Sequence, residues 1–310
     1  MTSQNFYAHG KLLLTSEYCV LDGAPAIALP TKLGQTLSVQ TQTTNNNQLH
    51  WQAFNMDKTC WIDAIFDLET FEINQTSKQS PNILQKILQQ ARIQNPDFLT
   101  QPNDLNITTY LDFNKDWGLG SSSTLIHTIS QWANICPFTL LNATLGGSGY
   151  DIACAHADGP ILYQKQGDPL WSHTNFNPRF ANQLYFIYLN KKQNSRDSIN
   201  QYKSQEKPSA EILDSLNKIV SSIQKAEHLD EFEDAIKAHE NLISKQIKRP
   251  TVKEKHFSDF QGTIKSLGAW GGDFILATST QGDEETFAYF KKRGYNTILK
   301  YEDLILNNNA

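Results

Sequence analysis

The sequence predicts an α+β protein with two domains. Its 310 residues exceed the usual length of a single domain, and this length predicts about two. Strand-like apolar runs alternate with runs of helical spacing, and the second half has the order strand, helices, strand, helix, strand. That order predicts helices that cover one face of a sheet. The turn Gly167–Asp168–Pro169 is the predicted linker, which gives domains 1–168 and 169–310.

The composition indicates a globular protein. Hydrophobic residues make up 39% of the chain, charged residues make up 19%, and the net charge is −5. Residues 1–170 hold 8 Lys and Arg against 14 Asp and Glu, which argues against nucleic acid as a partner. The four cysteines have no metal-ligand spacing, so we expect reduced thiols. Without a signal peptide or a membrane-length apolar run, the sequence predicts a cytoplasmic protein with no membrane partner.

The first half is predicted to combine several strands with two amphipathic helices. Alternating or β-branched runs predict strands at 6–14, 26–29, 36–43, 51–54, 59–66, 105–113 and 161–163. Ser80–Pro81 begins a helix by the capping rules, with an inner face of Ile83, Leu84, Ile87, Leu88 and Ala91. A second helix follows Thr124, and a short element starts near Leu140, after the break at Cys136–Pro137.

The second half is predicted to alternate strands with longer helices. Strands are expected at 183–189, 274–278 and 296–301, and helices at 209–225, 230–245, 251–267 and 284–293. A polar, basic turn is expected at 190–198, and a glycine-rich turn at 268–273 leads into the strand that follows it. In this turn Asp273 is expected to support the backbone rather than to perform chemistry.

A turn rich in glycine and serine, residues 116–124, links the strand 105–113 to the helix behind it. The first turn of a helix presents unpaired N–H groups and a partial positive charge, and glycines let an anion approach the backbone closely. Serine hydroxyls there can bind phosphate oxygens or Mg²⁺. No lysine follows the second glycine, so this is not the loop that ends in Gly-Lys-Ser/Thr. For this motif alone, an ordinary capped helix remains the alternative.

Two charged residues stand out near other turns. Lys11 lies near a strand start, where it is either solvated or reaches a shared anionic site. Asp151 follows the flexible run Gly146–Gly147–Ser148–Gly149 and precedes an apolar run, where it is either a functional carboxylate or a helix N-cap.

Taken together, four segments resemble the GHMP kinase superfamily. They are residues 9–18, 118–122, 149–151 and 268–273, and the resemblance extends over about residues 6–300. It implies an N-terminal domain with a left-handed βαβ crossover and a C-terminal ferredoxin-like domain. It also implies a phosphotransferase that uses ATP and Mg²⁺.

The resemblance further implies roles for individual residues. The ATP-binding residues would be Gly118, Leu119, Gly120, Ser121, Ser122, Ser123, Gly268, Gly271 and Gly272, and Ser122 would also contact Mg²⁺. Asp151 would act as the base for the acceptor hydroxyl, and Lys11 would keep Asp151 ionised and neutralise the acceptor oxygen. Contacts to the acceptor would come from Glu17, Ser148, Ser195 and Arg196.

Within the superfamily, residues 16–21 and 148–153 resemble phosphomevalonate kinases more than mevalonate kinases. We therefore expect a kinase of isoprenoid biosynthesis, in the mevalonate pathway, whose small-molecule acceptor is phosphomevalonate. The alternatives are a mevalonate kinase, a diphosphomevalonate decarboxylase and a catalytically silent binding protein. The silent alternative is motivated by Asn114, where the motif usually has proline, and by Trp270, which interrupts the third glycine run. A monomer and a homodimer both remain open.

Overall fold

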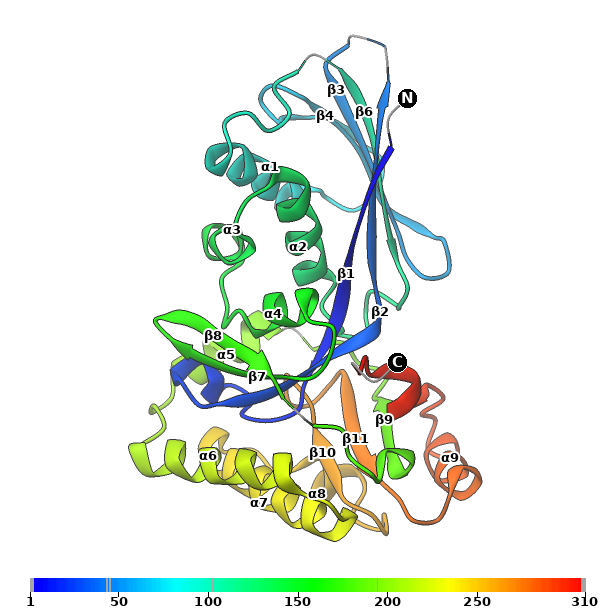
Figure 1. Ribbon diagram of the computed structural model, residues 1–310. Coiled ribbons are helices and arrows are strands. Elements are labelled where there is room, and N and C mark those ends of the chain that lie inside the picture. Colours follow the sequence, from blue (N-terminus) through cyan, green and yellow to red (C-terminus); the bar gives the residue numbers. More distant parts are fainter. Residues whose placement is uncertain are drawn as a thin grey trace. The chain divides into compact units, whose positions relative to one another are not determined.

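The computed structural model describes residues 3–42, 44, 46–101, 103–174, 176–193 and 195–307, without the side chains of Ser195 and Arg196. It has the mixed α+β architecture that the sequence predicts (Figure 1). The chain groups into two compact units. The first unit comprises Met1–Gly10, Leu33–Lys115 and Leu119–His156, and the second comprises Lys11–Lys32, Asp116–Gly118 and Ala157–Ala310. Because these units interleave along the chain, the boundary at residue 168 stays a prediction about domains.

The first unit contains a sheet in the order β5-β4-β3-β6-β2, with β1 paired to β2. Its strands are β1 (Ser3–Leu13), β2 (Ala26–Gln42), β3 (Gln48–Phe54), β4 (Cys60–Asp67), β5 (Ile73–Thr76) and β6 (Asp104–Leu111); β1 and β2 begin or end in the second unit. The two separate strands predicted at 26–29 and 36–43 are wrong, because β2 is one strand of 17 residues. Gly34 does not break it. A Cβ there would lie 2.2 Å from the carbonyl oxygen of Ala8, so glycine is what allows this close approach.

Helices cover one face of this sheet (Figure 1). They are α1 (Asn82–Gln94), α2 (Ser121–Ala133), α3 (Pro137–Thr144) and α4 (Tyr150–His156). The predicted helices at residue 81 and after residue 124 are confirmed as α1 and α2. Leu84, Ile87, Leu88 and Ala91 are buried as predicted, but Ile83 is 44% exposed because it lies to one side of their stripe.

A hairpin in the second unit replaces the predicted linker. Strands β7 (Ile161–Gln166) and β8 (Asp168–His173) pair antiparallel, and Gly167 turns the chain between them with a φ of 73°. The first residues of β2 pair with β7. The turn at 167–169 therefore joins two paired strands, and a Gly-Asp-Pro turn looks the same in sequence whether it joins strands or domains.

The second unit also contains a four-stranded antiparallel sheet. Its strands are β9 (Leu184–Tyr188), β10 (Ile264–Ser266), β11 (Phe274–Thr278) and β12 (Ile298–Lys300), in the spatial order β10-β11-β9-β12. With helices between β9 and β10 and between β11 and β12, the chain order is β-α-β-β-α-β, which is that of a ferredoxin-like unit.

Most helices of the second unit lie between β9 and β10. They are α5 (Ser195–Lys203), α6 (Ala210–Lys225), α7 (Leu229–Ile247) and α8 (Val252–His256); α9 (Asp283–Lys291) and α10 (Tyr301–Leu304) come later, and short 3₁₀ turns lie at Cys19–Asp22 and Ala181–Gln183. The predicted helix 251–267 is wrong beyond His256. Gly262 runs so close to β11 that a Cβ would lie 1.8 Å from the carbonyl oxygen of Thr278. The predicted turn 190–198 likewise becomes α5 from Ser195 onward.

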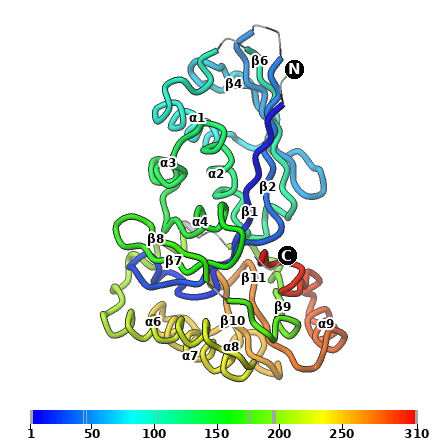
Figure 2. Tube along the Cα trace, viewed as in Figure 1, coloured from blue at the N-terminus to red at the C-terminus, as the bar shows by residue number. Residues whose placement is uncertain are grey.

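The early segment 11–32 packs against helices that come much later in the sequence. Figure 2 shows this blue segment beside the yellow helices α6 and α7. Tyr18 and Cys19 share a buried cluster with Leu216 of α6 and Ile243 of α7. Within the described ranges, no helix is long and apolar enough to cross a membrane.

Candidate active site

The predicted site residues fall in both units. The first unit holds Leu119, Gly120, Ser121, Ser122, Ser123, Ser148 and Asp151, and the second holds Lys11, Glu17, Gly118, Ser195, Arg196, Gly268, Gly271 and Gly272. The side chains of Ser195 and Arg196 lie outside the described part, so their roles stay predictions.

Helix α2 begins at a glycine with left-handed backbone. Gly120 has a φ of 93°, and among the described residues no side chain caps the helix. Ser123 donates its hydroxyl back to the carbonyl oxygen of Gly120 at 2.8 Å, whereas Ser122 is exposed and Ser121 is partly exposed. The buried Leu119 holds the turn against the protein interior. The first turn of α2 therefore offers backbone N–H groups and one exposed hydroxyl to an anion or a metal ion.

Gly118 lies directly against the carboxylate of Asp273. Its φ is 72°, and a Cβ there would lie 2.4 Å from Cγ of Asp273. The ammonium of Lys11 donates to the carbonyl oxygen of Gly118 at 2.8 Å. Lys11 is thus bound to the backbone of the glycine turn, and its role toward an anionic ligand stays a prediction.

Asp273 supports the backbone around this turn. Its buried carboxylate accepts the N–H of Gln193 at 3.1 Å, and its own N–H donates to the carbonyl oxygen of Lys191 at 2.7 Å. Burial raises the pKa of Asp273, although the N–H of Gln193 and the charges of Lys11 and Lys192 oppose the rise. The carboxylate is thus engaged in holding two backbone segments.

Two side chains from the end of β9 and the segment after it contact the start of the glycine turn, and neither was predicted. Tyr188 of β9 donates its hydroxyl to the carbonyl oxygen of Asp116 at 3.0 Å. Lys192 forms an ion pair with the carboxylate of Asp116 at 3.2 Å. The only sequence signal for Lys192 was the basic character of the turn after β9, and Tyr188 reads as an ordinary strand residue.

We expect Gly118→Ala to destabilise the protein by about 1–3 kcal/mol more than Gly294→Ala. Both glycines have positive φ, so both variants carry backbone strain, but no described atom lies within 4 Å of a Cβ at Gly294. Only the Cβ at Gly118 collides with Asp273, and overpacking of this kind costs about 1–3 kcal/mol. Chemical denaturation of both variants measures the difference. Equal unfolding free energies would contradict the close approach of Gly118 to Asp273.

The third glycine turn, residues 268–272, leaves one side open. Gly268 and Gly271 have φ values of 63° and 100°, and no described atom lies within 4 Å of a Cβ at either. Gly272 instead packs closely, with its Cβ position 2.6 Å from the carbonyl oxygen of Lys191. Trp270, between these glycines, is 3% exposed, and its indole packs in a cluster with Tyr18.

Asp151 lies in the first turn of α4. Gly149 precedes it with a φ of 94°, and the Asp151 carboxylate accepts the N–H of Ile152 at 3.1 Å. The side chain is partly exposed, whereas Ser148 is buried. Asp151 therefore lies at the start of a helix, as one of the two alternatives predicted, and its catalytic role stays a prediction.

The carboxylate of Glu17 belongs to a buried ion cluster. It lies 2.6 Å from the ammonium of Lys265, which is also 3.3 Å from the carboxylate of Glu240. Burial raises the pKa of Glu17 to about 7, although the charge of Lys265 opposes the rise. His239 accepts the N–H of Ser16 at 2.7 Å beside this cluster. Because Glu17 is 1% exposed, we do not retain it as an acceptor contact.

Two histidines lie between α2 and α4, the helices that carry Ser122 and Asp151. The rings of His127 and His156 have centroids 5.6 Å apart, and His127 is buried. Burial lowers the pKa of His127 to about 4, and the charges of His156 and His9 lower it as well. The neutral form of His127 is thus the one that fits this interface.

We expect acid to destabilise the wild type more than His127→Leu. The pKa of His127 is lower in the folded state than in the unfolded state, so its contribution is complete above about pH 6.5 and is lost as the pH falls through about 4. That loss is on the order of 3 kcal/mol between pH 7 and pH 4. Between pH 7 and pH 4 the unfolding free energy of the wild type should therefore fall by about 3 kcal/mol more than that of His127→Leu. Parallel curves would contradict a buried neutral His127.

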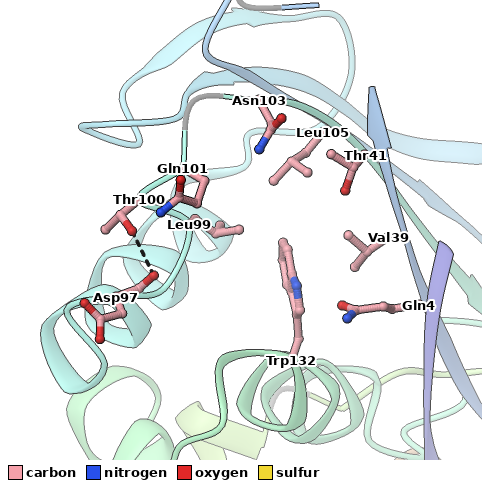
Figure 3. Close-up of a pocket in the computed structure, with 10 residues that line it drawn as sticks. All are labelled: Gln4, Val39, Thr41, Asp97, Leu99, Thr100, Gln101, Asn103, Leu105 and Trp132. Carbon is pink, nitrogen blue, oxygen red and sulfur yellow. Dashed lines mark hydrogen bonds between the residues drawn. The ribbon is translucent and has the colours of Figure 1, made fainter. Parts of the chain in front are cut away.

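A cavity of about 230 Å³ lies elsewhere in the first unit (Figure 3). The indole of Trp132 points into it from the last turn of α2, near Val39 and Leu99. Trp132 is about 16 Å along the helix from Ser121, and no predicted site residue lines the cavity. The cavity is therefore separate from the phosphate-binding turn predicted at residues 118–123.

Comparisons with solved structures show close similarity of fold at low sequence identity. Methanococcus jannaschii mevalonate kinase matches with a TM-score of 0.71 and 17% identity, over 99% of each chain. Streptococcus pneumoniae phosphomevalonate kinase, in complex with phosphomevalonate and AMPPNP, matches with a TM-score of 0.67 and 17% identity, over 96% of this chain and 99% of that one. Lactococcus lactis galactokinase, in complex with galactose, gives a TM-score of 0.69 and 10% identity, over 98% of this chain and 94% of that one. No protein-family model and no curated protein sequence matches the chain.

Proposed function

We propose that this chain, which has the fold of the GHMP kinases, is an ATP-dependent kinase of a small molecule. The observation that carries the proposal is the start of α2, where the left-handed Gly120 leaves the first turn uncapped and Ser122 exposed. The N–H groups of this turn would bind the β- and γ-phosphates. A protein of the same fold has been solved with AMPPNP, which supports a nucleotide as the anion.

The exposed hydroxyl of Ser122 fits a Mg²⁺ ion that arrives with the nucleotide. Such an ion needs few protein ligands, because phosphate oxygens and water fill most of its coordination sphere. Among the described residues, no group of three or more His, Cys, Asp or Glu could hold a metal ion. When bound, Mg²⁺ would supply positive charge beside the transferred phosphoryl group.

The remaining chemistry requires positioning and charge stabilisation. Asp151 would orient the acceptor hydroxyl and take its proton. The ammonium of Lys11, which donates to the carbonyl oxygen of Gly118, would neutralise charge on the acceptor oxygen and favour the ionised form of Asp151. The turn 268–272 would contact the triphosphate with the open side of Gly268 and Gly271. Burial of Trp270 supports the kinase over the catalytically silent alternative that this residue motivated.

The acceptor that fits best is phosphomevalonate, because residues 16–21 and 148–153 resemble the corresponding segments of phosphomevalonate kinases. The test is ADP and CO₂ release from Mg²⁺–ATP with mevalonate, phosphomevalonate or diphosphomevalonate as acceptor. ADP without CO₂, with phosphomevalonate alone, is the expected result. ADP with mevalonate would indicate a mevalonate kinase. Release of CO₂ together with ADP from diphosphomevalonate would indicate the decarboxylase.

A further inference from the structure

Two hydrogen bonds hold the backbone of Trp270, the residue at the centre of the third glycine turn. The N–H of Trp270 donates to the hydroxyl of Tyr18 at 2.9 Å. The carbonyl oxygen of Trp270 accepts from the guanidinium of Arg249 at 3.3 Å. Residue 270 therefore has both of its backbone polar groups bound to side chains from distant parts of the second unit.

The side chain of Trp270 adds an apolar anchor to these bonds. Its buried indole packs in the cluster that contains Leu216, Ile243 and Tyr18. Tyr18 is itself fixed, because its ring stacks on Tyr202 at 5.4 Å and is 8% exposed. Its backbone has a φ of 62°, a conformation that is rare for a tyrosine and persists only where surrounding contacts impose it.

A turn with three glycines needs such an anchor, because glycine backbone has more conformational freedom to lose than any other. A turn fixed in advance loses less freedom when a ligand binds, so it binds that ligand more tightly. We propose that Tyr18 and Trp270 are positioning residues that fix the turn 268–272 in the shape that binds the nucleotide phosphates. This inference rests on the proposed kinase function.

Removal of the Tyr18 hydroxyl would leave the buried N–H of Trp270 without its partner. An unsatisfied buried donor is costly, so the turn would shift until water could reach this group. Nucleotide affinity would then fall, whereas the chemistry of the bound nucleotide would change little, since neither side chain is assigned to the reacting atoms.

The experiment compares Tyr18→Phe with Tyr202→Phe. Tyr202 lies in the same stack and is also buried, but its hydroxyl donates to the carboxylate of Asp22 at 2.6 Å. We expect Tyr18→Phe to raise the calorimetric Kd for Mg²⁺–AMPPNP about 10-fold and Tyr202→Phe to change it less than about 2-fold. In turnover, KM for ATP should rise in Tyr18→Phe with kcat almost unchanged. Equal Kd values for the two variants would overturn the proposal.

Hydrogen–deuterium exchange of the free protein separates this inference from the proposed function. Exchange at residues 267–273 should be faster in Tyr18→Phe than in Tyr202→Phe, and unchanged exchange would overturn the anchor whether or not nucleotide binds. Faster exchange with no AMPPNP binding by the wild type would instead overturn the nucleotide role and the kinase proposal together. Arg249→Gln, which removes the other hydrogen bond to Trp270, should shift exchange in the same direction and serves if Tyr18→Phe does not fold.

Discussion

Asp151→Asn is expected to lower kcat by about three orders of magnitude and to leave the fold intact. The amide cannot accept the proton of an acceptor hydroxyl, and loss of a general base costs about 10²–10⁴ in rate. The asparagine oxygen can still accept the N–H of Ile152, which the carboxylate does now at 3.1 Å, so α4 should be preserved. Steady-state ADP release at saturating ATP and acceptor measures the loss.

The matching stability measurement makes this result interpretable. Thermal unfolding of Asp151→Asn should lie close to that of the wild type, because the substitution keeps size and one hydrogen-bond acceptor. A folded variant with a kcat near that of the wild type would remove Asp151 from the mechanism. The helix-terminal role seen in the structure would then be its whole role.

Lys11→Met is expected to lower kcat about 10²–10³-fold and to raise KM for ATP. The methionine keeps most of the length of the side chain but removes the charge that would stabilise the acceptor oxygen. Loss of such a stabilising group costs about 10²–10³ in rate. It also removes the hydrogen bond to the carbonyl oxygen of Gly118, so the glycine turn loses one support. Separate measurement of kcat and KM distinguishes these two consequences.

Lys192→Met is the matched control for Lys11→Met. Lys192 also lies beside the glycine turn, but its half-exposed ammonium pairs with the half-exposed carboxylate of Asp116, and such pairs contribute little. We expect its activity to stay within about 5-fold of the wild type. If the two variants lost activity equally, Lys11 would act through general positive charge rather than through a specific contact.

Local rules explain which elements could be predicted from the sequence. The helices α1 and α2 have apolar stripes that are complete within about a dozen residues, and both were predicted. The continuous β2 and the early end of α8 were not predicted. Gly34 and Gly262 each lie against the backbone of a distant segment, and such a contact leaves no local signal in the sequence. In a sequence, a glycine that ends a helix or strand looks the same as a glycine that allows another segment to approach the backbone closely.

The sequence predicted the motifs of the candidate site, but not the distant residues that contact those motifs in the fold. The glycines and serines at the start of α2 follow from local chemistry, since a helix terminus binds anions without outside help. Trp270 read as an obstacle, because burial of its indole depends on Tyr18 and on helices far away in the sequence. Glu17 read as an acceptor contact for the same reason, since Lys265, its ion-pair partner, lies 248 residues further along the chain.

The most direct test of the kinase proposal is acceptor-dependent ADP production by the purified protein with Mg²⁺–ATP. The acceptors would be mevalonate, phosphomevalonate, diphosphomevalonate, homoserine and galactose, with Asp151→Asn measured beside the wild type. We expect turnover with phosphomevalonate that is lost in the variant. No acceptor-dependent ADP with any of the five, or equal turnover by Asp151→Asn, would contradict the mechanism proposed for this chain.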